Sequence, residues 1–183
     1  MKITPLEIPA VLLIELEKRQ DERGFFARLS CKDELAEAGL PGDWLQVNNS
    51  LTAQAGVVRG LHFQRPPSAE VKMVRCIRGA IFDVAVDLRE KSPTFGQWVG
   101  RTLTAESRDM LYIPEGFGHG FQSLEADSEI IYFNTANYAP DLEGGVRHDD
   151  PEIGIQWPLP ISFTSERDKC LPRLNSLDPI KVA

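Results

Sequence analysis

A series of short β-patterned segments, separated by turn-forming residues, most constrains how this chain can fold. The segments are rich in β-branched and aromatic residues, and clusters of Gly, Pro, Asn and Ser separate them. Many short strands at regular spacing are typical of an antiparallel sandwich or small barrel. The predicted strands are residues 44–51, 56–64, 71–78, 80–88, 96–103, 110–113, 119–124 and 128–135. The sequence therefore predicts an all-β fold.

Residues 71–88 show the strand alternation most clearly. In residues 71–78, Val71 and every second residue after it belong to one face of the strand, and Lys72 and every second residue after it belong to the other. Gly79 then marks a turn before a second alternating segment, residues 80–88. Successive side chains of a strand point to opposite faces of the sheet. Lys72 therefore lies on one face of its strand, and either a solvated surface or a functional role accounts for its charge.

The two ends of the chain have different patterns. Residues 2–18 predict two short strands, because Pro5 and Pro9 prevent a long helix. Residues 33–38 favour a short helix, with Ser30 as its N-cap. From about residue 139 the chain is rich in loops, and we expect this segment to pack over the sheet because Trp157 needs burial. We predict a single domain spanning residues 1–183, with only a few short helices.

Composition excludes several classes of function. The net charge of −7 disfavours a general affinity for nucleic acid, whose phosphates attract basic surfaces. The three cysteines are far apart, which indicates neither a disulfide framework nor a zinc site. We find neither the pattern of a signal peptide nor an apolar run of membrane-spanning length. We therefore expect a cytoplasmic protein with no membrane partner.

His62 is the first candidate for chemistry, within Arg59-Gly60-Leu61-His62-Phe63-Gln64. A histidine that acts as a general base needs a partner that orients its imidazole. Asp168 is one candidate, although its spacing from Ser165 is also that of a helix cap. Simple alternation places Arg59 and His62 on opposite faces of a strand. A β-bulge at Gly60 would place them on the same face.

A metal site is not indicated by the histidines. His62, His119 and His148 lie far apart in sequence, and the chain contains no HxH or HExxH motif. A mononuclear site needs about three or four N, O or S ligands. We therefore predict no metal ligands.

Several motifs occur in order along the chain. They are Asp21-Glu22-Arg23-Gly24-Phe25-Phe26, Gln46-Val47-Asn48-Asn49-Ser50, Arg59-Gly60-Leu61-His62-Phe63-Gln64, Asp83-Val84-Ala85-Val86-Asp87-Leu88-Arg89 with Ser92-Pro93-Thr94-Phe95-Gly96, Pro114-Glu115-Gly116-Phe117-Gly118-His119-Gly120-Phe121, Tyr132 to Tyr138-Ala139-Pro140, Asp149-Asp150-Pro151 and Ser165-Glu166-Arg167-Asp168. In combination they closely resemble the dTDP-4-dehydrorhamnose 3,5-epimerase family, over roughly residues 3–172.

The resemblance implies a cupin-like antiparallel β jelly roll that forms a homodimer and uses neither metal nor cofactor. It also implies an isomerase that epimerises a nucleoside-diphosphate 4-keto-6-deoxyhexose at carbons 3 and 5, toward L-rhamnose or a related sugar for polysaccharide biosynthesis. In the family's pattern His62 is the base, oriented by Asp168. Lys72 stabilises charge on the keto oxygen, and Tyr132 returns a proton from the opposite ring face.

The resemblance also implies the binding residues. Arg23, Arg59 and Arg167 correspond to contacts with the diphosphate or sugar. The remaining pocket positions are Phe26, Gln46, Asn48, His119, Tyr138 and Glu143. Arg28 replaces a glutamate that family members usually have, which leaves the nucleotide base open. A single-centre epimerase, a ketoisomerase and a non-catalytic sugar-nucleotide binder are the alternatives.

Overall fold

The computed structural model describes residues 1–182, and its strands form two large antiparallel sheets and one small hairpin. The six-stranded sheet contains, in spatial order, β1 (Lys2–Pro5), β2 (Leu12–Glu15), β10 (Met110–Ile113), β7 (Lys72–Arg78), β12 (Ser128–Asn134) and β5 (Gln46–Thr52). The five-stranded sheet contains β13 (Glu143–Gly145), β6 (Val58–Gln64), β11 (Phe117–Ser123), β8 (Ala80–Asp87) and β9 (Trp98–Thr104). All eight strands predicted between residues 44 and 135 are confirmed, as are the two predicted in residues 2–18.

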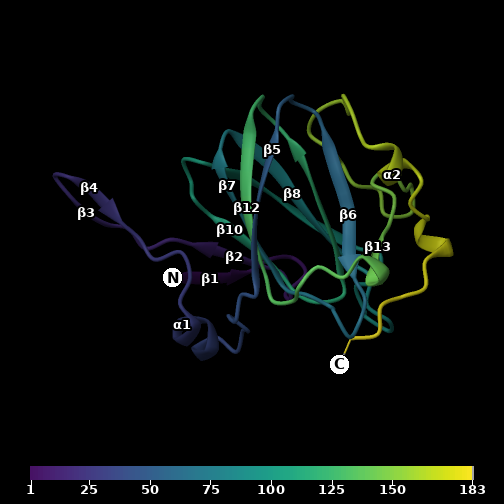
Figure 1. Cartoon of the computed structure of the whole chain (residues 1–183), viewed down its shortest axis with the longest axis horizontal. Coiled ribbons are helices and arrows are strands. Elements are labelled where there is room, and N and C mark those ends of the chain that lie inside the picture. The colour runs from purple at the N-terminus through teal and green to yellow at the C-terminus, as the bar shows by residue number, and fades with distance from the viewer. Residues whose placement is uncertain (183) are drawn as a thin grey trace.

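The two large sheets pack face to face as a β jelly roll, which confirms the predicted fold (Figure 1). Alternation decides which side chains enter the space between the sheets. On β7, Val74 and Cys76 belong to the core cluster that also contains Ile81 and Phe121 of the other sheet. Met73 points the other way and packs with Leu35 on the outer face of the six-stranded sheet. Lys72 shares its face with Val74, so it points inward.

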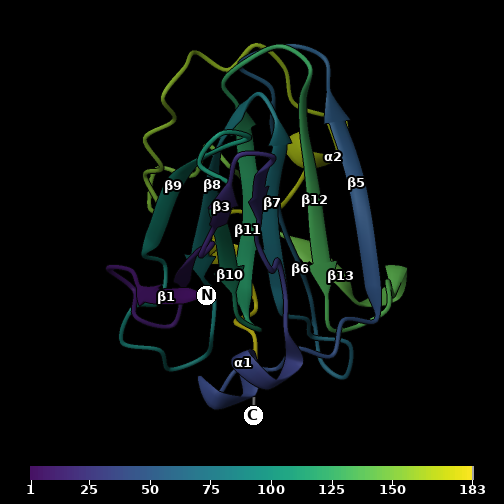
Figure 2. The ribbon, with the colours of Figure 1, turned by 90° about the vertical axis from the view of Figure 1, so that its left-hand side faces the viewer.

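The helices are short and peripheral. Helix α1 (Lys32–Glu37) lies near one end of the sandwich (Figure 2), and α2 (Glu166–Lys169) lies beside β6. Two 3-10 turns, η1 (Pro140–Leu142) and η2 (Leu174–Ser176), complete the set. The predicted N-cap of α1 was wrong: Cys31 occupies that position without a side-chain bond. Ser30 instead accepts a hydrogen bond from the Trp44 indole at 2.7 Å, so its hydroxyl is used in tertiary packing.

Two segments extend beyond the sandwich. The hairpin of β3 (Arg19–Asp21) and β4 (Gly24–Phe26) projects away from both sheets (Figure 1). The loop-rich segment after residue 139 covers the five-stranded sheet, where Val146 and Ile153 pack against Leu61 and Val86. This covering segment brings α2, and with it Asp168, beside β6.

Candidate active site

A β-bulge in β6 places Arg59 and His62 on the same side of the sheet. His62 pairs with His119 and Arg59 pairs with Phe121, so β6 has one more residue than β11 between the two pairs. Gly60 lies in the bulge with φ of 112°, and a Cβ there would lie 2.6 Å from the carbonyl oxygen of His119. Only glycine fits this backbone and this close approach. The bulge at Gly60 therefore replaces the simple alternation that would separate Arg59 from His62, and both side chains line one cavity.

His62 and Asp168 form a dyad. Nε2 of His62 lies 2.7 Å from Oδ1 of Asp168, and Oδ2 accepts the backbone N–H of Gly60 at 3.2 Å. Ser165 caps α2 by accepting the backbone N–H of Asp168 at 3.0 Å. The backbone of Asp168 therefore takes part in the helix cap while its side chain orients the imidazole. The two interpretations of its spacing are compatible.

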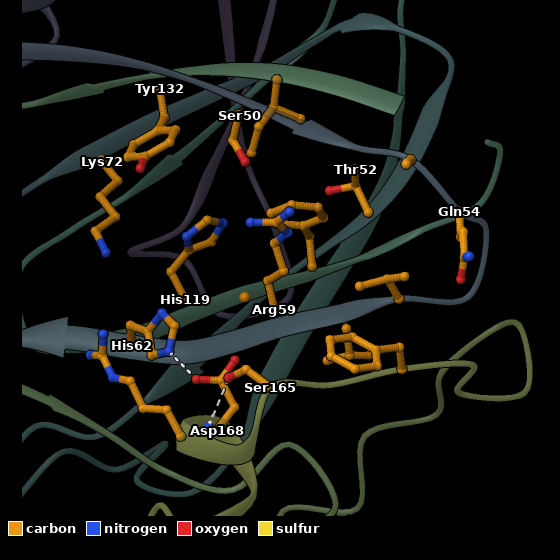
Figure 3. A pocket seen from close by; sticks show the side chains of 18 residues that line it. Ser50, Thr52, Gln54, Arg59, His62, Lys72, His119, Tyr132, Ser165 and Asp168 are labelled. Carbon is orange, nitrogen blue, oxygen red and sulfur yellow. Dashed lines mark hydrogen bonds and ion pairs between the residues drawn. The ribbon is translucent and has the colours of Figure 1, made fainter. Parts of the chain in front are cut away.

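The dyad faces a cavity of about 580 Å³ between the two sheets (Figure 3). His62, Arg59 and His119 line it from the five-stranded sheet. Lys72 of β7 and Tyr132 of β12 line it from the six-stranded sheet. A ligand in this cavity would therefore have an imidazole on one side and an ammonium and a phenol on the other.

Burial and neighbouring charges shift the pKa values of Asp168 and Tyr132. Burial opposes ionisation of Asp168, but the hydrogen bond and charge of His62 outweigh it and hold the pKa of the carboxyl below its usual value. Burial, followed by the negative charge of Glu70, raises the pKa of Tyr132 above that of a free phenol. Asp168 is therefore a carboxylate at neutral pH, and Tyr132 holds its proton.

A second histidine–aspartate pair lies deeper in the sandwich. Nε2 of His119 lies 2.7 Å from Oδ1 of Asp83, which is completely buried. His119 still lines the cavity, next to its cross-strand neighbour His62. Asp83 was not predicted as a site residue, although its position as an acid in an apolar strand indicates a buried partner.

A smaller cavity of about 130 Å³ adjoins the first, and His62, Lys72 and Tyr132 line both. Gln46, Asn48, Tyr138 and Glu143 line this second space, as predicted for pocket residues. Glu143 accepts the Tyr138 hydroxyl at 2.7 Å and pairs with Arg167 at 2.5 Å. Burial opposes ionisation of Glu143, but these two partners keep its pKa below the usual value.

Arg23 and Phe26 are not brought to either cavity. Both lie on the β3–β4 hairpin, where the Arg23 side chain is 85% exposed and Phe26 is 66% exposed. Arg23 pairs with Asp21 of the same hairpin at 2.6 Å. Arg28, just beyond the hairpin, pairs with Glu34 of α1. Within one chain, these predicted binding residues are therefore remote from the dyad.

Comparison with known proteins identifies the family of this chain. A family model described as dTDP-4-dehydrorhamnose 3,5-epimerase matches residues 5–176. The chain belongs to this family. The enzyme of that name from Sinorhizobium fredii is 45% identical over 182 residues, covering 97% of this chain and 91% of the relative. A relative from Streptomyces niveus, named dTDP-4-dehydrorhamnose 3-epimerase, is 43% identical over 92% of this chain and 82% of its own length.

Among solved structures, the dTDP-6-deoxy-D-glucose-3,5-epimerase of Legionella pneumophila is similar over 100% of this chain and 98% of its own. The TM-score is 0.92 and the sequence identity 37%. That protein was solved in complex with dTDP-4-keto-L-rhamnose. The family is one of nucleotide-sugar epimerases, which confirms the predicted class of protein.

The structure adds site residues that the sequence did not indicate. Glu70 and Asn134 line the smaller cavity, and Glu70 lies 3.2 Å from the Lys72 amine. The one available signal was the spacing of Glu70 and Lys72, which places an acid two residues before a base.

Across residues 1–182 no three His, Cys, Asp or Glu side chains are grouped to hold a metal ion. In the same range, no helix is long and apolar enough to cross a membrane.

Proposed function

We propose that this protein epimerises a dTDP-4-keto-6-deoxyhexose at carbons 3 and 5, with His62 as the base. The observation behind this proposal is the His62–Asp168 dyad, which faces Lys72 and Tyr132 across one cavity. Both carbons flank the 4-keto group, so loss of either proton gives an enolate. The Lys72 ammonium stabilises the enolate oxygen, an electrostatic contribution that is often the largest in such reactions.

Inversion requires that the proton return to the other ring face. His62 belongs to the five-stranded sheet and Tyr132 to the six-stranded sheet, on opposite walls of the cavity. Tyr132 is therefore suited to donate a proton to the face away from His62, and its raised pKa keeps that proton available. The reaction consumes no redox equivalent, because one proton leaves and one returns at each carbon.

We assign the remaining residues to substrate binding. Arg59 and Arg167 supply guanidinium groups at the cavity for the diphosphate. His119, Gln46, Asn48, Tyr138 and Glu143 supply polar and aromatic contacts to the sugar and base. Asp168 comes from the segment after residue 139, so this segment and both sheets act as one functional domain. Three free cysteines agree with our proposal of a cytoplasmic location.

We also propose a homodimer, in which the β3–β4 hairpin of one protomer reaches the cavity of its partner. Arg23 and Phe26 are exposed on this hairpin and remote from the site of their own chain. Apolar side chains also occur on the outer face of edge strand β5, where Val47 is 56% exposed and Leu51 is 48% exposed. Exposed apolar surface of this kind is typical of protein interfaces.

Epimerisation at one carbon is the second candidate, because the Streptomyces niveus relative is named a 3-epimerase. Incubation with dTDP-4-keto-6-deoxyglucose in deuterated water distinguishes the two. We expect deuterium at carbons 3 and 5 of the product, measured by NMR. Deuterium at carbon 3 alone would contradict the double epimerisation. An absence of exchange would contradict enzyme activity altogether.

Substitutions in the same assay test the assigned roles. His62→Ala should abolish exchange at both carbons while leaving the fold intact. Tyr132→Phe should allow slow exchange without inversion, because His62 still removes a proton and returns one to the same face. Tyr112→Phe is the matched control, since Tyr112 is a buried core tyrosine outside both cavities. Normal turnover by His62→Ala would refute the mechanism.

A further inference from the structure

Glu70 has a buried side-chain carboxylate, and the reaction described above gives it no direct contact with the substrate. Its side chain is 8% exposed, and it lies two residues before Lys72, the first residue of β7. Oε1 lies 3.2 Å from the Lys72 amine, and Oε2 accepts the Asn134 side-chain amide at 2.6 Å. A buried charge is costly unless it is paired and hydrogen-bonded. Both oxygens of Glu70 are engaged in this way, and one of them is directed at the cation of the site.

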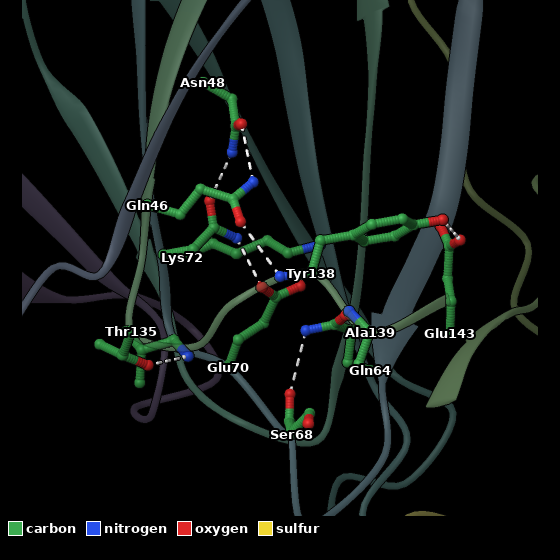
Figure 4. A network of polar contacts seen from close by, with 12 residues as sticks. Gln46, Asn48, Gln64, Ser68, Glu70, Lys72, Thr135, Tyr138, Ala139 and Glu143 are labelled. Carbon is green, nitrogen blue, oxygen red and sulfur yellow. Dashed lines mark hydrogen bonds and ion pairs between the residues drawn. The ribbon is translucent and has the colours of Figure 1, made fainter. Parts of the chain in front are cut away.

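The contact with Asn134 continues as a chain of side-chain amides (Figure 4). Asn48 donates to Asn134 at 3.1 Å, and Gln46 donates to Asn48 at 2.8 Å. Gln46 then accepts the backbone N–H of Tyr138 at 3.0 Å. Strand register explains the chain, because Asn134 pairs directly with Lys72 on one side and with Gln46 on the other. The chain joins Lys72 to residues 135–139, the segment that contains Tyr138.

The direction of every amide in this chain is determined by its two ends. A carboxylate can only accept hydrogen bonds, whereas a backbone N–H can only donate. With Glu70 at one end and the Tyr138 N–H at the other, Asn134, Asn48 and Gln46 each have one orientation that satisfies both neighbours. Reversing any one of them would place two donors or two acceptors in contact. The geometry of the chain therefore depends on the charge state of residue 70.

We propose that Glu70 is a positioning residue, which holds the Lys72 ammonium at the cavity wall and orients the amides that tie it to residues 135–139. This inference rests on the proposed epimerase function. In it, Lys72 stabilises the enolate and Tyr138 contacts the nucleotide. Glu70 thereby fixes the position of the Lys72 ammonium, which acts on the reacting carbons. Through the amide chain it also fixes the segment that contains Tyr138, which contacts the nucleotide.

Glu70→Gln tests the proposal, because the substitution keeps the shape and removes the charge. The amide introduced at position 70 can direct its oxygen to Lys72 or to Asn134, but not to both. One donor–donor contact therefore forms, either at Lys72 or further along the amide chain. We expect kcat to fall on the order of 10- to 100-fold, and KM to rise. Glu90→Gln is the matched control, since Glu90 is exposed and away from both cavities.

Adding Gln46→Glu to the Glu70→Gln variant provides a sharper test. When the new amide at position 70 donates to Asn134, all the amides can reverse. The carboxylate introduced at position 46 can then accept both Asn48 and the Tyr138 N–H. KM of the double variant should return toward the original value while kcat stays low, because Lys72 still lacks its carboxylate.

Gln46→Glu should have the opposite effect on KM in the native protein, where Glu70 is present. With Glu70 present, Gln46→Glu places an acceptor-only group at both positions, so the amides between them cannot satisfy both ends and KM should rise. The effect of one substitution thus changes sign with the other, as a double-mutant cycle measures.

Equal effects of Gln46→Glu on KM in both backgrounds would overturn the amide chain. Unchanged kcat in Glu70→Gln would overturn the positioning of Lys72. Calorimetric binding of dTDP to the four proteins measures the sign change without turnover. A protein that binds dTDP with this sign change but exchanges no deuterium would therefore refute the proposed function and support the amide chain.

Discussion

At the scale of single residues, Asp168 belongs both to a helix cap and to the dyad that we propose removes the substrate proton. Its backbone N–H completes the Ser165 cap of α2, and its carboxylate bonds to His62 and to the backbone of the bulge. The cap places the aspartate, and the aspartate then orients the imidazole. Because different atoms perform the two tasks, substitution can separate them.

Asp168→Asn should lower kcat by about a thousandfold, because a neutral amide neither stabilises the imidazolium nor favours the correct tautomer. The cap survives in this variant, since it uses the backbone N–H. Ser165→Ala is the converse control. It removes the cap bond, lowers stability by about 1 kcal/mol and keeps the dyad. Exchange rates and thermal unfolding of both variants check this. A stability loss in Asp168→Asn with normal turnover would favour a purely structural role.

The depressed pKa of Asp168 also predicts how stability depends on pH. The pKa of its carboxyl in the folded protein lies below the ordinary value of 3.8. The contribution to stability is therefore complete above that value, and it is lost as pH falls through the lower folded pKa. We expect the melting temperature of the native protein to exceed that of Asp168→Asn near neutral pH. The difference should shrink in acid, and parallel melting curves from neutral pH to about pH 2 would contradict this.

At the scale of elements, the strands were predictable because periodicity of two is a local property. The bulge in β6 was predictable only as the condition that would place Arg59 and His62 on one face, with Gly60 between them. Contacts between distant segments were not. The environment of Lys72 depends on the five-stranded sheet, which faces it across the cavity. The amide chain depends on the register of β5 against β12. Neither register nor covering can be read from one strand's pattern.

The helix cap illustrates the same limit. Ser30 and Asp33 have the spacing of a capping pair, but the Ser30 hydroxyl accepts from Trp44, which lies 14 residues further along the chain. A tertiary hydrogen bond has replaced a local one. The His62–Asp168 dyad joins residues separated by 106 positions. Its identification from the sequence therefore required the ordered series of motifs, since spacing alone left Asp168 as either cap or partner.

At the scale of the whole molecule, the β3–β4 hairpin extends away from both sheets (Figure 1), and its Arg23 and Phe26 line neither cavity of their own chain. Phe26 is 66% exposed. A two-stranded hairpin is marginally stable by itself in water. Docking against a second copy would bury this aromatic surface. A symmetric dimer repeats each contact, so each protomer would both donate a hairpin and receive one.

Mixing two inactive variants tests this exchange of hairpins. One variant is His62→Ala, and the other is Arg23→Ala with Phe26→Ala. In a mixed dimer the second variant keeps His62 and receives an intact hairpin from the first, so one of its two sites is complete. With random pairing, about a quarter of all sites should recover activity. Co-refolding the variants and measuring deuterium exchange checks this. If each hairpin served its own chain, no mixed dimer would contain a complete site, and the mixture would stay as inactive as its components.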